Sequence, residues 1–241
     1  AVEDFRVPDR IVVGATDSMT AEVFLNVYAD FTCPKLVTTP RTAEMIKYVS
    51  NSLLATMISF SNEIGNMCSA VPGVDARLVW KGVHLDRRLT PINGQVGGAA
   101  GVTEYLWHGL GFGGSCFPKD VAALRSFGRT VGEQTRMLDA VLDINADQPL
   151  RMVALLEKEL NLAGKTVAVL GLAFKPGTDD LRESPALPLV AELRKKGAKV
   201  LVHDPIAMPH AKKRPEFRDV VFAEDWAEAL RKSDACCIVT A

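Results

Sequence analysis

The chain has 241 residues, of which 48% are hydrophobic and 24% are charged, and its formal net charge is -1. This is the composition of an ordinary globular protein with one large domain or two small ones. A charge so close to zero excludes a protein-wide field that recruits nucleic acid or an anionic membrane. No apolar run approaches the roughly 20 residues that a bilayer-spanning helix needs. We therefore expect neither nucleic acid nor a membrane as a partner.

The cysteines and histidines bear on compartment and metal binding. There are five cysteines, an odd number, and no pair of them has the spacing of a zinc site. The four histidines also lack metal-ligand spacing, so no metal is expected. Five thiols in a chain of this length do not make a disulfide scaffold, and they predict a reducing, cytoplasmic location.

The N-terminal segment bears on targeting and on whether the chain is part of a longer protein. AVEDFRVPDR is charged and has no apolar stretch, so it is not a signal peptide. It also begins without Met, and we therefore expect the chain to be a piece of a longer protein.

The first part of the chain is predicted to be mainly helical. A short strand at 10–14 is followed by apolar residues at helical spacing over 20–32. The next expected segments are helices at 38–70, 75–85 and 121–162, the last with breaks near Gly128 and at 147–149, and Gly-rich loops at 90–103 and 109–120.

The predicted helix at 38–70 has the clearest pattern. Thr38 and Thr39 supply a cap, and Pro40 suits the first helical position. Apolar residues run almost all the way round it, at Met45, Ile46, Val49, Leu53, Leu54, Met57, Ile58, Ile64 and Met67. A stripe of this width is typical of a helix buried by several neighbours, and one small domain is too little to cover it. We therefore expect a homodimer formed through the helical part.

From Gly164 the pattern changes to alternating strands and helices. Strands are expected at 165–174, 198–205, 218–222 and 234–241, with amphipathic helices at 184–197 and 223–233. This alternation predicts a Rossmann-like, doubly wound parallel sheet covered by helices. The fold class is therefore α/β, a helical domain followed by this sheet. Because the last residues form a strand, we expect the sheet to continue beyond Ala241.

The segment GFGGSCFPKD, residues 111–120, carries the chemistry. Three glycines in four positions allow a close backbone approach to a ligand, and successive loop N–H groups can hold an anion. Cys116 follows them, Lys119 favours its thiolate, and Asp120 is a candidate base. The alternative is an inert core thiol in a plain turn, which is how we interpret Cys33, Cys68, Cys236 and Cys237. For Cys116 the glycines, the cation and the carboxylate together favour a nucleophile.

This segment resembles the active-site signature of the UDP-glucose/GDP-mannose dehydrogenase family. Two further blocks resemble the same family in order and spacing: AEMIKYVSNSLLATMISFSNE (43–63), its central helix, and GLAFKPGTDDLRESPA (171–186), the start of its C-terminal domain. The strand at 10–14 with its following helix resembles the segment that leaves the N-terminal domain. The resemblance covers essentially the whole chain.

The resemblance implies an enzyme that oxidises a nucleotide sugar at C6 to the acid in two steps, with NAD as cofactor. UDP-glucose is the first choice, while GDP-mannose, TDP-glucose and UDP-N-acetyl sugars stay open. Cys116 would hold a thiohemiacetal and then a thioester, and Asp120 would assist the water that releases the acid. Two other classes remain: a non-catalytic nucleotide-sugar-binding dimer module, and the helical domain of a β-hydroxyacid-type dehydrogenase.

Further residues take roles by resemblance. Lys47 and Asn51, which share a helical face and otherwise make a solvated stripe, would contact the sugar and stabilise an oxyanion. The other implied substrate-binding residues are Arg88, which would reach the neighbouring subunit's substrate, Gly111, Phe112, Gly113, Phe174 and Lys175. Lys119 and Arg182 would reach NAD.

The resemblance also implies three domains. Residues 1–36 would end an NAD-binding domain, 37–147 would form the helical central dimerisation domain, and 148–241 would form part of a nucleotide-sugar-binding Rossmann-like domain. No predicted strand in 1–241 leads directly into a G-x-G-x-x-G motif, which is the fingerprint of an NAD-binding domain. We therefore expect this chain by itself to be inactive.

Overall fold

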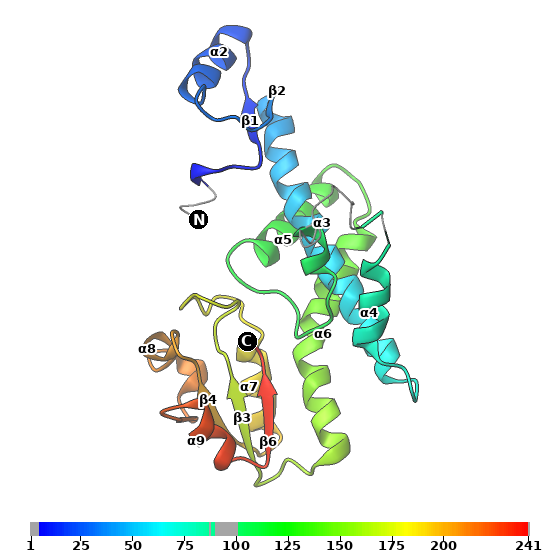
Figure 1. Cartoon of the computed structure of the whole chain (residues 1–241), viewed down its shortest axis with the longest axis vertical. Coiled ribbons are helices and arrows are strands. Elements are labelled where there is room, and N and C mark those ends of the chain that lie inside the picture. The colour runs from blue at the N-terminus through cyan, green and yellow to red at the C-terminus, as the bar shows by residue number, and fades with distance from the viewer. Residues whose placement is uncertain (1–4, 87, 90–100, 241) are drawn as a thin grey trace. The chain divides into compact units, whose positions relative to one another are not determined.

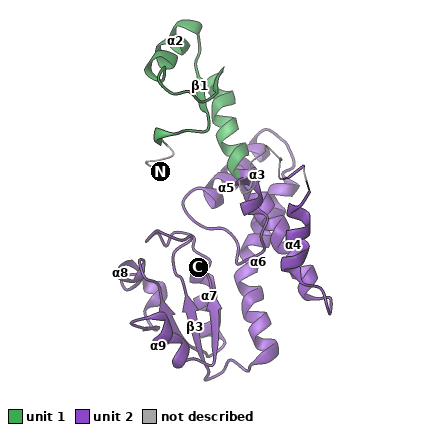
Figure 2. Ribbon diagram, viewed as in Figure 1, with its two compact units in different colours: residues 1–51 green, residues 52–241 purple. Residues whose placement is uncertain are grey.

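The computed structural model describes residues 5–86, 88–89 and 101–240. They form two compact units, residues 1–51 and residues 52–241 (Figure 2).

The first unit contains a small parallel β-α-β arrangement. Strand β1 (Ile11–Gly14) pairs with β2 (Lys35–Thr38), and helix α2 (Ser18–Val27) connects them. Asp17 caps α2 by accepting a hydrogen bond of 2.8 Å from the N–H of Thr20. The strand and the helix confirm the sequence-based prediction, whereas β2 was not predicted. Its four residues are too short a run to stand out from a loop.

Helix α3 (Pro40–Ser69) begins at the predicted proline and runs through the unit boundary. The hydroxyl of Thr39 accepts from the N–H of Thr42 at its start. In a single copy, several residues of the predicted stripe are exposed: Met45, Val49, Leu53 and Met67. The buried positions of the helix are small or polar residues such as Ser59 and Asn62. Burial of the exposed part of the stripe by a second copy stays a prediction.

The helical part of the second unit continues with α4 (Ala76–His84), the 3-10 helix η1 (Gly101–Tyr105), α5 (Phe117–Thr130) and α6 (Arg136–Glu159). Residues 90–100 of the predicted loop at 90–103 lie outside the described residues. The expected break near Gly128 is found just after it, between α5 and α6. The expected break at 147–149 is wrong, because Pro149 lies inside α6.

A parallel sheet of four strands forms the rest of this unit (Figure 1). The strands are β3 (Thr166–Leu170), β4 (Lys199–His203), β5 (Val221–Phe222) and β6 (Ala235–Ile238), in the order β5-β4-β3-β6. The connections include α7 (Ala186–Lys195), α8 (Met208–Ala211), the 3-10 helix η2 (Pro215–Phe217) and α9 (Trp226–Arg231). All four strands were predicted, and the α/β fold class is confirmed.

The two faces of β3 pack differently, as the two-residue period of a strand requires. Val167 and Val169 join a large core with α7, which contributes Leu189 and Leu193 among other residues. Ala168 on the opposite face packs with α9 in a smaller cluster. Packing on both faces holds the central strands firmly in place. In such sheets, ligands bind at the carboxyl ends of the strands. Within the described residues, no helix combines the length and apolarity needed to cross a membrane.

Candidate active site

The glycine loop leads directly into a helix. Gly111 and Gly114 have positive φ angles of 99° and 82°, which L side chains rarely adopt. Cys116 is the N-cap residue of α5, and its carbonyl accepts the N–H of Asp120 at 2.8 Å. The predicted loop at 109–120 is therefore shorter than expected, because Pro118 in the first turn favours a helix that begins at Phe117.

Helix α6 holds the first half of the loop. The N–H of Phe112 donates to the Asn145 side-chain oxygen at 2.7 Å, and the Asn145 amide donates back to the Phe112 carbonyl at 3.0 Å. A Cβ at Gly111 would lie 2.5 Å from that same Asn145 oxygen. Pro149, four residues after Asn145 in α6, has no N–H to donate to the Asn145 carbonyl. Asn145 was not predicted as a site residue, since a single Asn in a helix carries no distinctive signal.

The segment after β3 holds the second half. The N–H of Gly114 donates to the Arg182 carbonyl at 2.9 Å. A Cβ at Gly113 would overlap the Glu183 carbonyl oxygen and lie 2.8 Å from the carbonyl carbon. A Cβ at Gly114 would lie 2.7 Å from the ring of Phe174. The structure therefore brings the predicted residues Gly113, Phe174 and Arg182 together, although they are far apart in the sequence.

The thiol of Cys116 is exposed, and the Ser115 hydroxyl lies 3.8 Å from its sulfur. Lys119, which the sequence suggests as the cation near the thiol, forms an ion pair with Asp120. The Asp120 side chain is only 2% exposed, so this pair keeps a carboxylate in a nearly dry position at the start of α5.

Arg182 interacts electrostatically with the thiol. Hydrogen bonds from its side chain to Asp180, and the Asp180 charge, raise the pKa of Arg182 above its usual value, and the charge of Cys116 adds a smaller contribution. Arg182 thus lies near enough to Cys116 for a thiolate and a guanidinium to interact. The sequence suggested Arg182 only as a residue that reaches NAD.

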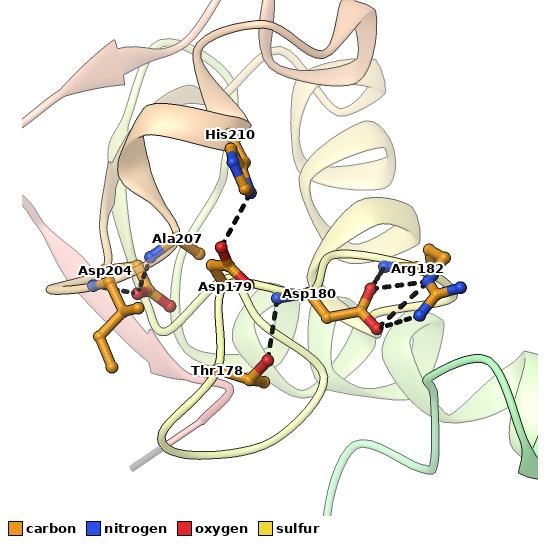
Figure 3. Close-up of polar contacts among 8 residues, drawn as sticks. Thr178, Asp179, Asp180, Arg182, Asp204, Ala207 and His210 are labelled. Atoms are coloured by element: carbon orange, nitrogen blue, oxygen red, sulfur yellow. Dashed lines mark hydrogen bonds and ion pairs between the residues drawn. The ribbon is translucent and has the colours of Figure 1, made fainter.

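The loop that carries Phe174, Lys175 and Arg182 is closed by its own polar groups (Figure 3). The N–H of Phe174 donates to the Asp180 carbonyl at 3.1 Å, and Arg182 forms a two-pronged ion pair with the Asp180 carboxylate. Asp179 contacts His210 of α8 at 3.3 Å. The ammonium of Lys175 lies 5.6 Å from the centre of the Phe174 ring.

A cavity of about 880 Å³ lies beside the thiol loop within the second unit. Its lining includes Phe112, Ser115, Lys119, Asn145, Arg182 and Arg214. The lining contains three cationic side chains, those of Lys119, Arg182 and Arg214, and two anionic ones, those of Glu183 and Glu216, so cations are in excess by one, which suits an anionic ligand. Arg214 pairs with Glu216 and was not predicted, because it is one of several basic residues in the run KKR.

Among the predicted substrate residues, Phe112 lines this cavity, whereas the other seven are not among its lining residues: Lys47, Asn51, Arg88, Gly111, Gly113, Phe174 and Lys175. Lys47 and Asn51 belong to the first unit, where Lys47 is exposed and Asn51 half-buried one turn apart on α3. Arg88 lies in the turn after α4 with an exposed side chain that forms a two-pronged pair with Asp86. That pair lowers the pKa of Asp86 to about 2, chiefly through the side-chain hydrogen bonds.

Two family models match the chain. Residues 41–147 match the central domain of the UDP-glucose/GDP-mannose dehydrogenase family, and residues 168–241 match its UDP-binding domain. Together the two matches cover most of the chain.

Individual relatives and a solved structure belong to the same family. The UDP-glucose 6-dehydrogenase AglM of Haloferax volcanii is 42% identical over the whole chain, which covers 54% of that protein. The UDP-glucose 6-dehydrogenase TuaD of Bacillus subtilis is 38% identical, with 49% of its length covered. A solved UDP-glucose dehydrogenase from Pyrobaculum islandicum superposes with a TM-score of 0.90 at 44% identity, over 100% of this chain and 53% of that one. The chain spans about half the length of the curated relatives it matches.

Proposed function

Since this chain belongs to the UDP-glucose/GDP-mannose dehydrogenase family, we propose that it acts in the NAD-dependent oxidation of UDP-glucose at C6 to the uronic acid. The observation that carries the proposal is the thiol loop. Cys116 is exposed at the start of α5, and Asn145 and the Phe174–Glu183 segment hold its loop from two sides. Such a loop presents a nucleophile in one fixed position.

The Cys116 thiol explains how the oxidation can continue from the C6 aldehyde to the acid. Attack of the Cys116 sulfur on the C6 aldehyde forms a carbon–sulfur bond, and the carbonyl oxygen takes up the proton to give a thiohemiacetal. Loss of the C6 hydrogen with two electrons, and of the hydroxyl proton, gives a thioester. Water then displaces the sulfur, releasing the acid and restoring the thiol. NAD supplies the electron acceptor for both oxidations when bound. The Arg182 guanidinium lies close enough to Cys116 for the two charges to interact when the sulfur is a thiolate.

The other catalytic roles follow the family. Lys47 and Asn51 contact the sugar, and Lys47 provides positive charge for the oxyanion that develops at C6. Asp120 accepts a proton from the attacking water, and its ion pair with Lys119 keeps the carboxylate in place at the start of α5.

The binding roles divide between two ligands. Gly111, Phe112, Gly113, Phe174 and Lys175 bind the nucleotide sugar, and Arg88 reaches the substrate of a neighbouring subunit. Lys119 and Arg182 hold NAD, and they fit it because they place two cations in one cavity beside the thiol.

The sheet domain at 148–241 is the nucleotide-sugar-binding part, 37–147 is the central domain, and 1–36 ends the NAD-binding domain. The free state of the five cysteines supports a cytoplasmic location.

GDP-mannose, TDP-glucose and UDP-N-acetyl sugars are the alternative substrates, and a non-catalytic binding module is the alternative function. The named relatives favour UDP-glucose. Turnover of a panel of these nucleotide sugars, measured in an enzyme that joins this chain to a dinucleotide-binding domain, distinguishes among them.

The proposed binding residues predict which of the two ligands the isolated chain binds. We expect calorimetry to detect UDP-glucose binding to residues 1–241 but no NAD binding, because two cations do not orient a dinucleotide without a Rossmann fingerprint. Lys175→Ala should weaken UDP-glucose binding about tenfold, the effect of losing one charge-assisted hydrogen bond. Lys195→Ala, an exposed lysine on α7, is the matched control and should bind normally. NAD-dependent turnover by this chain alone contradicts the expectation.

We also propose that two copies of the chain pair through α3. Leu53, Phe60 and Met67 are spaced seven residues apart, and their side chains are 58%, 52% and 61% exposed. Seven-residue spacing keeps large side chains on one face along a helix, and a second copy presents the same face. A self-complementary apolar stripe is therefore the surface that a homodimer covers.

Sedimentation tests this pairing. The chain should sediment as a dimer at micromolar concentration, and Phe60→Glu should shift it to the monomer because a charge cannot be buried in that stripe without a partner. Phe127→Glu on α5, whose ring is similarly exposed, should stay dimeric. A monomeric wild-type chain would remove the basis for the proposal.

A further inference from the structure

A buried carboxylate lies beneath the loop that carries Phe174 and Lys175. Asp204 follows β4 directly, and it is 5% exposed. One of its side-chain oxygens accepts from the N–H groups of Leu172 at 2.7 Å and Ala173 at 3.2 Å. The other accepts from Ile206 at 2.8 Å and Ala207 at 2.7 Å, the second of which Figure 3 shows. The carboxylate therefore joins the turn after β3 to the segment that leads into α8.

This arrangement places an internal anion where such sheets often bind an external one. In dinucleotide-binding sheets, successive N–H groups of the turn after the first strand hold a ligand phosphate. Here the N–H groups of Leu172 and Ala173 already have a carboxylate acceptor. These two N–H groups are therefore not available to a ligand, and ligand contacts at this strand end fall to the residues that follow the turn.

The turn is connected to the thiol loop by direct contacts. Phe174 is the next residue after Ala173, and its ring packs against Gly114 so closely that a Cβ there would lie 2.7 Å away. The carbonyl of Ala173 accepts from the Thr240 hydroxyl at 2.6 Å, which holds the turn from the β6 side. A shift of Leu172 and Ala173 would consequently move Phe174, and with it the loop that leads to Cys116.

We propose that Asp204 is a positioning residue for the nucleotide-sugar site, holding the turn at 172–173 so that Phe174 and Lys175 meet the ligand and the thiol loop keeps its place. The proposal rests on the proposed function for its ligand. Burial by itself raises the pKa of the Asp204 carboxyl, but the four N–H groups outweigh it and hold the pKa below its usual value. Asp204 therefore stays ionised at neutral pH and accepts all four hydrogen bonds.

Asp204→Asn tests the proposal with almost no change of shape. The asparagine keeps one acceptor oxygen, so its NH₂ group must face either the two N–H donors of the turn or the two on the α8 side. We expect UDP-glucose affinity, measured by calorimetry on the whole chain, to fall at least about tenfold. Amide exchange at 172–175 and alkylation of Cys116 by iodoacetamide should both become faster.

Two variants control for a purely structural effect. Leu193→Ala removes a fully buried side chain of α7 and should cost about 2–5 kcal/mol of stability while leaving affinity and Cys116 alkylation near wild-type values. Thr240→Val removes the hydroxyl that holds the same turn from the other side, and it should change the same three readouts in a milder form. It also serves as the test if Asp204→Asn does not fold.

The outcomes separate this proposal from the proposed function. Wild-type affinity, or unchanged exchange and alkylation, in Asp204→Asn (or, if that variant does not fold, in Thr240→Val) would overturn the role of Asp204. Equal losses of affinity in Leu193→Ala would do the same, since they would mark the effect as general destabilisation. A wild-type chain that binds no nucleotide sugar would count against the proposed function, while exchange at 172–175 and Cys116 alkylation would still decide whether Asp204 positions the site.

Discussion

Cys116→Ser is expected to lower the rate of acid formation by several orders of magnitude in an enzyme that joins this chain to a dinucleotide-binding domain. A serine hydroxyl is far less acidic than a thiol, so it is a much weaker nucleophile toward the C6 aldehyde at neutral pH. Without the carbon–sulfur bond there is no thiohemiacetal to oxidise and no thioester to hydrolyse. The measurement is the amount of uronic acid formed per enzyme, followed together with NADH formation.

A second cysteine provides the matched control. Cys236→Ser changes a half-buried thiol in β6, where burial raises the thiol pKa and the residue serves packing in our interpretation. It should retain most of the activity. An acid-formation rate in Cys116→Ser equal to that of Cys236→Ser is incompatible with a covalent mechanism at Cys116 and would favour a dehydrogenase that needs no thiol.

Gly113→Ala is expected to have the next largest effect. The added methyl group would overlap the backbone carbonyl of Glu183, and a backbone atom cannot rotate away as a side chain can. Either the thiol loop or the 182–183 segment must move, which should cost about 1–3 kcal/mol of stability. Because the same movement shifts the thiol loop relative to Phe174 and Arg182, UDP-glucose affinity and acid formation should each fall about a hundredfold.

The same segment supplies a control and a rescue for this variant. Gly109→Ala adds an identical methyl group where nothing lies within 4 Å, so it should behave as wild type. Glu183 is the only described non-glycine residue with a positive φ, at 51°, and Glu183→Gly frees its backbone to retreat. The double variant should recover part of the lost affinity. Equal behaviour of Gly113→Ala and Gly109→Ala would show that the close contact is unimportant.

Local pattern was enough to predict most elements of this protein. Pro40 after two threonines predicts the start of α3, and the strand runs after Gly164 predict the parallel sheet, because caps and hydrophobic period depend on neighbouring residues. The same kind of pattern failed at Pro149. A proline usually ends or kinks a helix, but here packing of α6 against α5 and α7 continues the helix past it.

The candidate site was predictable in its residues more than in its arrangement. GFGGSCFPKD identifies a thiol loop by composition and resemblance, and Phe174 and Arg182 were suggested in the same way. No local pattern indicates that Asn145 forms hydrogen bonds with the Phe112 backbone. The same holds for the Glu183 carbonyl, which leaves no room for a side chain at Gly113, and for the interaction of Arg182 with the Cys116 charge. The partners in these contacts are far apart in the sequence. Phe112 and Asn145 are separated by 33 positions, and Gly113 and Glu183 by 70.

The sequence by itself therefore determined most element types and the α/β class, and it pointed to Cys116 as the nucleophile that we propose. Tertiary structure alone decided which large apolar residues of α3 are exposed, that Arg182 lies near Cys116, and that the Asp204 carboxylate accepts hydrogen bonds from the turn after β3. The physical reason is the range of the interactions involved. Helix and strand periodicity are set by residues within a few positions, whereas burial, ion pairing and close backbone contact depend on segments that only folding brings together.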